Sequence, residues 1–73
     1  MSTANLIKMV NQIAQYFAIE PDHQKAVLGV RNHLQMYWTP GMRKELLAWQ
    51  TEHHGADLLP LAQEAVSGAG WEA

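Results

Sequence analysis

The stretch that decides the fold is NHLQMYWTPGMRKELL, residues 32–47. Its first part has the apolar spacing of an amphipathic helix, and Thr39-Pro40 interrupts that spacing before a second helix begins. A residue that precedes proline disfavours helical backbone angles, so the helix before this interruption must end at about Trp38. Thr39 suits the N-cap of the next helix, and Pro40 suits its first position because the N–H that proline lacks would be unpaired there. The sequence therefore predicts two helices joined by a tight turn.

Helical periodicity continues on both sides of this joint, with apolar residues at the i, i+3, i+4, i+7 spacing. Four helices are predicted: one from Ser2 or Thr3 to about Ala18, one from Pro21 to Tyr37 or Trp38, one from Pro40 to about His53, and a short one from Leu58 to about Val66. Asp22 favours the start of the second helix, Gly55 the end of the third, and Asp57 the cap of the fourth. The apolar arc of the first helix covers nearly half its circumference, which is more than packing on one neighbour requires.

The predicted fold class is all-α: a small bundle of three helices plus a short fourth helix. No segment has the period of a strand, and 73 residues leave room for one hydrophobic core. We expect a single helical domain over residues 1–66 and a flexible C-terminal tail over residues 67–73, in which the position of Trp71 stays open. The residues expected to meet in one core cluster are Phe17, Val30, Leu34, Trp38, Leu46 and Trp49.

Composition favours a protein that depends on a partner. Only 16% of the residues are charged, against roughly 25% in ordinary soluble domains. A chain this short buries only about 60% of its unfolded surface, so small domains often gain stability from a disulfide, a metal or another subunit. The chain has no cysteine, which favours the subunit and fits a reducing compartment.

Charge and hydropathy narrow the expected partners and location. The net charge is −2 with five Lys and Arg residues, which argues against nucleic acid as a partner. No apolar run approaches the ~18 residues of a membrane helix, and the N-terminus lacks the pattern of a signal peptide. We therefore expect a cytoplasmic protein that contacts neither nucleic acid nor a membrane.

The residues that carry chemistry do not form a catalytic or metal-binding pattern. None of the four histidines is paired at the i, i+4 spacing of helical zinc ligands, and no nucleophile lies near a base. The aromatic residues Tyr37, Trp38 and Trp49 with Arg43 could stack on a base, but core packing and an interface anchor are the favoured interpretation. We therefore predict no catalytic, cofactor-binding or metal-binding residue, and no cofactor in this chain.

One strip of the second helix is a candidate contact surface. Leu28 and Met36 fall outside the main apolar face, with Gly29 and Asn32 between or beside them. An exposed apolar strip beside a glycine would allow another backbone to approach closely from outside. The alternative is two scattered surface hydrophobic residues, which are common in soluble proteins.

The chain resembles the small delta subunit of the soluble NAD-dependent formate dehydrogenases. Two blocks carry the resemblance, KMVNQIAQYFA at residues 8–18 and NHLQMYWTPGMR at residues 32–43, within a matching region of residues 6–47. The resemblance implies a non-catalytic accessory subunit of a cytoplasmic complex. Such a complex oxidises formate at a molybdenum or tungsten pterin site and passes electrons through iron–sulfur clusters and flavin to NAD. The cofactors would belong to the other subunits.

The partner implied by the resemblance is the molybdopterin-containing alpha subunit, whose assembly or stability this chain would support. The residues expected to bind it are Trp38, Met42, Arg43, Leu28, Met36 and Asn32. Two alternatives stay open. One is a transient assembly chaperone, and the other is a self-associating helical adaptor that forms a homo-oligomer through the Leu28 and Met36 strip.

Overall fold

The computed structural model describes residues 2–67, and over that range it is helical without any strand. The four helices are α1 (Thr3–Phe17), α2 (His23–Tyr37), α3 (Pro40–His53) and α4 (Pro60–Ser67). The predicted all-α class and the three helices with a short fourth are therefore confirmed. Of the predicted tail, Ser67 is the last residue of α4, and the remainder, with Trp71, lies outside the described residues.

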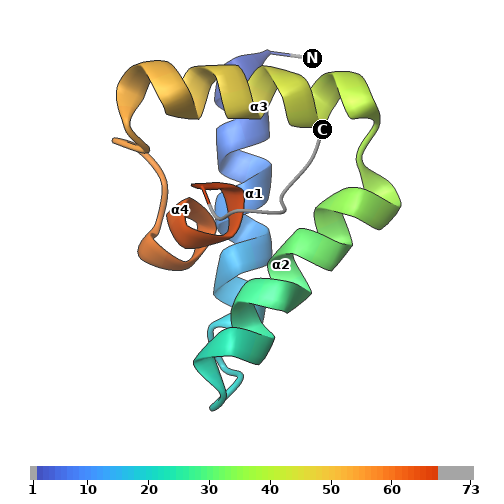
Figure 1. Ribbon diagram of the computed structural model, residues 1–73, viewed down its shortest axis with the longest axis vertical. Coiled ribbons are helices and arrows are strands. Elements are labelled where there is room, and N and C mark those ends of the chain that lie inside the picture. The colour runs from blue at the N-terminus through green and yellow to red at the C-terminus, as the bar shows by residue number, and fades with distance from the viewer. Residues whose placement is uncertain (1, 68–73) are drawn as a thin grey trace.

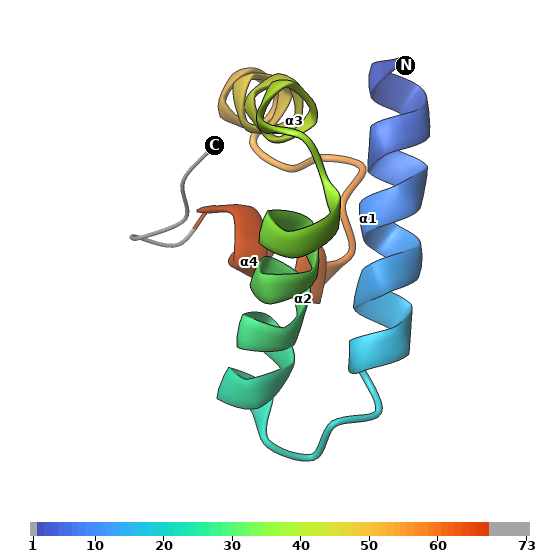
Figure 2. The same cartoon turned by 90° about the vertical axis from the view of Figure 1, so that its right-hand side faces the viewer.

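The helices pack around α4, which contacts the other three. Helices α1 and α2 lie side by side, and α3 crosses the N-terminal part of α1 at a large angle (Figures 1 and 2). The chain changes direction between α2 and α3, at the tight turn that joins them. The short C-terminal helix therefore fills the space that the first three helices enclose.

Side-chain caps begin three of the helices, and two of the caps, Ser2 and Thr39, are those expected from the sequence. The hydroxyl of Ser2 accepts a hydrogen bond from the backbone N–H of Asn5 (3.2 Å), and the hydroxyl of Thr39 accepts one from Met42 (3.2 Å). Asp22 caps α2 through the N–H of Lys25 (3.2 Å), so it precedes the helix in an extended conformation. The predicted start of this helix at Pro21 was therefore two residues too early.

Helix α4 also begins two residues later than expected, at Pro60. Asn11 of α1 explains the difference, because its side-chain amide binds the backbone on both sides of Leu58. It donates to the carbonyl oxygen of Asp57 (3.0 Å) and accepts from the N–H of Leu59 (2.9 Å). These bonds hold residues 57–59 outside the helix, and Asp57 is not its cap.

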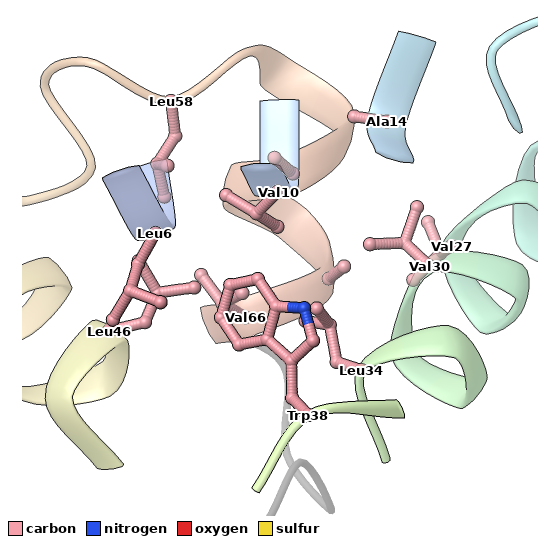
Figure 3. Close-up of a cluster of buried hydrophobic side chains, with 12 residues drawn as sticks. Leu6, Val10, Ala14, Val27, Val30, Leu34, Trp38, Leu46, Leu58 and Val66 are labelled. Carbon is pink, nitrogen blue, oxygen red and sulfur yellow. The ribbon is translucent and has the colours of Figure 1, made fainter. Parts of the chain in front are cut away.

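The hydrophobic core joins all four helices (Figure 3). Four of the six predicted core residues are buried: Val30, Leu34, Trp38 and Leu46. Phe17 and Trp49 are half-buried and pack against that cluster, so the predicted cluster is confirmed with these two at its edge. The buried hydrophobic residues outside the six named for the cluster belong to the apolar faces of their helices or, for Leu58, to the segment before α4: Leu6, Val10, Ala14, Ala26, Val27, Leu58, Ala62, Ala65 and Val66. Small side chains on α4 allow it to fit among its larger neighbours.

Gly29 serves the contact between α1 and α2. A Cβ atom at this position would lie 2.5 Å from two carbon atoms of the Phe17 ring. The expectation that Gly29 admits a partner from outside was therefore wrong, because the side without a Cβ atom faces α1. The lack of a side chain allows the aromatic ring to sit against the backbone of α2.

A Gly29→Ala substitution is expected to destabilise the fold by about 1–3 kcal/mol, because the added methyl group displaces the Phe17 ring. The free energy of unfolding in urea measures this change. Gly41→Ala is the matched control, since a Cβ atom there meets only the Thr39 hydroxyl at 3.9 Å. In that helix the same substitution should stabilise the fold by about 0.5–1 kcal/mol. Equal effects at the two positions would contradict the close contact between Gly29 and the Phe17 ring.

A Trp38→Ala substitution is expected to cost about 3–5 kcal/mol, because the side chain is buried within the core cluster (Figure 3). Such a loss is comparable with the whole stability of a small domain. Thermal unfolding followed by circular dichroism tests this expectation. A melting temperature within a degree or two of the parent would show that Trp38 contributes little to the core.

Candidate functional site

Hydrogen bonds at the end of α2 and at the start of α3 hold the joint between these two helices. The Nη1 atom of Arg43 in α3 donates to the carbonyl oxygen of Trp38 (2.7 Å). It also lies 3.4 Å from the carbonyl oxygens of Leu34 and Gln35, in the last turn of α2. Thr39, from the turn itself, caps the start of α3. A positive charge at the C-terminal end of a helix satisfies its free carbonyl groups and its dipole.

Arg43 was expected to contact a partner, and the structure gives it a role within the chain. Its Nη1 atom is committed to the end of α2, and its Nε atom is buried without a hydrogen-bond partner among the described residues. A buried donor without a partner costs free energy, which the carbonyl bonds of Nη1 offset. The principal role of Arg43 is therefore to hold the joint.

An apolar groove lies beside this joint, with a volume of about 600 Å³. Residues of α1, of the C-terminal part of α2 and of the first turn of α3 line it: Met9, Gln12, Ile13, Tyr16, Phe17, His33, Tyr37, Trp38 and Met42. Tyr16 and Tyr37 are 71% and 69% exposed. Trp38, which is 5% exposed, contributes to the wall while it belongs to the core.

Contacts between rings order the aromatic lining. Tyr16 meets Phe17 edge to face, with ring centroids 5.0 Å apart and an interplanar angle of 88°. The ring of His33 lies 4.7 Å from that of Tyr37. Aromatic pairs of this geometry are favourable beyond the area that they bury. The groove therefore presents partly ordered aromatic surfaces to whatever binds there.

The six residues expected to bind a partner fall into three places. Trp38 and Met42 line the groove, and Arg43 holds the joint beside it. The other three lie outside the groove, on the exposed surface of α2: Leu28, Asn32 and Met36. Leu28 is 51% and Met36 73% exposed, so the apolar strip is at the surface.

Tyr16 and Ile19 are surface residues that were not expected from the sequence. Tyr16 belongs to the apolar arc of α1, yet it is largely exposed, and Ile19 is 82% exposed just after the helix. The width of the apolar arc of α1 was the feature of the sequence that could have indicated an exposed part. The edge of the arc, where Met9, Ile13 and Phe17 are only partly buried and Tyr16 is exposed, forms one wall of the groove.

The described histidines do not build a further site with carboxylates. His23 pairs with Glu64 at the surface, with 2.7 Å between Nε2 and Oε2, and links α2 to α4. His53 stacks on Trp49 at the end of α3. Within residues 2–67, no three His, Asp or Glu side chains are grouped so that they could hold a metal ion. None of the four described helices is both long enough and apolar enough to cross a membrane.

Comparison with known families identifies the chain. The model of the NADH-dependent formate dehydrogenase delta subunit FdsD matches residues 5–66. The chain belongs to this family. The FdsD match extends the resemblance seen in the sequence from the first three helices into α4, and it includes the whole groove. No curated protein and no solved structure matches the chain.

Replacing Arg43 by alanine in this FdsD-family chain should lower the free energy of unfolding by about 1–3 kcal/mol, because charged donors to the α2 carbonyl groups are lost. Arg43→Lys should recover only part of this, since a compact ammonium group does not reproduce the planar guanidinium. Urea unfolding of both variants measures the effect. The neighbouring exposed residue supplies the control, and Lys44→Ala should stay within about 0.5 kcal/mol. If Arg43→Ala lowers the free energy of unfolding no more than Lys44→Ala does, Arg43 does not stabilise the joint.

Proposed function

We propose that this chain is a non-catalytic accessory subunit that binds the molybdopterin-containing alpha subunit of an NAD-dependent formate dehydrogenase. Its task there is to support the assembly or stability of the complex. The observation that carries the proposal is the match of residues 5–66 to the family of delta subunits. The pterin, iron–sulfur and flavin groups of such a complex would all be held by its other subunits.

The surface of the domain supports this proposal. Within residues 2–67, five large hydrophobic residues are more than half exposed: Tyr16, Ile19, Leu28, Met36 and Tyr37. Apolar surface that is gathered in one place usually marks a contact with another molecule. The groove at the α2–α3 joint collects two of these residues, together with Trp38 and Met42. We therefore expect the partner to cover this side of the domain.

Two other functions make different predictions. A transient assembly chaperone would bind the alpha subunit during maturation and be missing from the purified enzyme. A self-associating adaptor would form a homo-oligomer, for which the exposed Leu28 and Met36 strip offers a surface. The stoichiometry of the purified complex separates both from a structural subunit.

The test is to express a tagged form of this chain together with the other subunits of its complex. The alpha subunit should copurify in a fixed ratio, because the apolar surface of the small domain stays covered in the holoenzyme. Deletion of the gene should lower the yield or thermal stability of the holoenzyme. Analytical size exclusion and formate-dependent NAD reduction measure these outcomes. Fully active and normally assembled enzyme without this chain, or a tagged chain that retrieves only itself, would contradict the proposal.

A further inference from the structure

We propose that the groove at the α2–α3 joint is the seat of an uncharged, apolar segment of the alpha subunit, which inserts a large side chain between Tyr16 and Tyr37. This inference rests on the proposed function and assigns the contact to one site. It also divides the six residues expected from the sequence. Trp38 and Met42 belong to the contact, Arg43 holds the joint beside it, and Leu28, Asn32 and Met36 lie outside it.

The absence of charge in the groove determines the chemistry of its occupant. The chain has five basic and seven acidic residues, and none of them lines the groove. Lys8 is the single charged residue in the whole of α1. A charged group inserted here would lose water without gaining an opposite charge, which is costly. The occupant is therefore uncharged where it meets the groove.

The lining has the composition of the buried centre of a protein interface. Six of the nine lining residues are aromatic or Met: Met9, Tyr16, Phe17, Tyr37, Trp38 and Met42. Interface centres are enriched in these residue types and depleted in Lys, Glu and Asp. Gln12 and His33 add the few polar groups that orient a bound segment.

The apolar surface extends beyond the groove in one direction. An adjoining hollow shares Tyr16 and Phe17 with the groove and continues to Ile19, which is 82% exposed. Glu20 is the first charged residue on this path. A segment seated between the tyrosines would thus continue along the C-terminal end of α1 and turn away near Glu20.

The Leu28 and Met36 strip of a second copy is a poor occupant because charged residues lie beside Leu28. Leu28 has Lys25 and Arg31 one helical turn away on either side. Arg31 is bound to the carbonyl oxygens of Ala65 and Glu64, so it stays at this place beside Leu28. Insertion of that strip would bring positive charge to an uncharged groove. A partner with an uncharged apolar segment fits better.

Site-specific photocrosslinking in the assembled complex tests the inference. Tyr16 is replaced by p-benzoylphenylalanine, which keeps an aromatic ring at the rim of the groove. Met36 carries the same probe as a matched control, since the two residues are 71% and 73% exposed. Irradiation should attach the Tyr16 probe to the alpha subunit, and mass spectrometry should map the adduct to an uncharged apolar segment. The Met36 probe should give no such adduct.

A charge placed in the groove gives an independent measurement. Tyr16→Arg should lower recovery of the alpha subunit about tenfold or more, as expected for a residue at the centre of an interface. Met36→Arg should leave recovery unchanged. Circular dichroism of both purified variants verifies that the helices are intact. Equal recovery with the two variants would overturn the assignment of the groove.

The outcomes separate this inference from the proposed function. Adducts of the Tyr16 probe with a second copy of the chain, with another subunit, or only at the level of the Met36 probe overturn the inference. In each case the delta-subunit function stands if the unmodified chain still copurifies with the alpha subunit. Failure of the unmodified chain to retrieve the alpha subunit overturns both.

Discussion

The hydrogen bond from Arg43 to the carbonyl oxygen of Trp38, 2.7 Å long, fixes the relation between α2 and α3. Without it, the carbonyl oxygen of Trp38 would lack this donor at the turn where the chain changes direction. Thr39 completes the joint from the other side by capping α3. Because the turn is held at both ends, Trp38 points into the core (Figure 3), and Met42 lines the groove. One local arrangement therefore positions both the core and the candidate site.

The boundaries that depend on neighbouring residues could be predicted from the sequence, and those that depend on distant residues could not. Ser2 and Thr39 cap their helices through residues three positions away, so their effect is visible in the sequence itself. The start of α4 depends on Asn11, which is 46 positions from Asp57 and 48 from Leu59. No local pattern shows that an asparagine of α1 binds the backbone there. The fold class needed only helical periodicity, which explains why it was predictable while this boundary was not.

The candidate site was predictable in part for the same reason. Periodicity shows that α1 has more apolar surface than one neighbour can cover, but it does not show which edge of the arc stays outside. Tyr16 has the spacing of this apolar arc, yet it lies at the rim of the groove. Gly29 shows the converse, because a small residue beside an exposed strip packs against Phe17 on the inner side. In both cases, the way a residue faces relative to the core depends on how the helices pack together, and the local sequence does not show this.

The groove and the core share side chains, which ties binding to stability. Trp38 is buried in the core and lines the groove, and Phe17 packs against the core, against Gly29 and into the groove wall. A partner that covers these rings adds contacts to residues that already stabilise the fold, and binding to the folded state raises its stability. A domain of this size has little stability in reserve. The apolar arc of α1 is covered on one side by α2, α3 and α4, and the proposed partner would cover the other side.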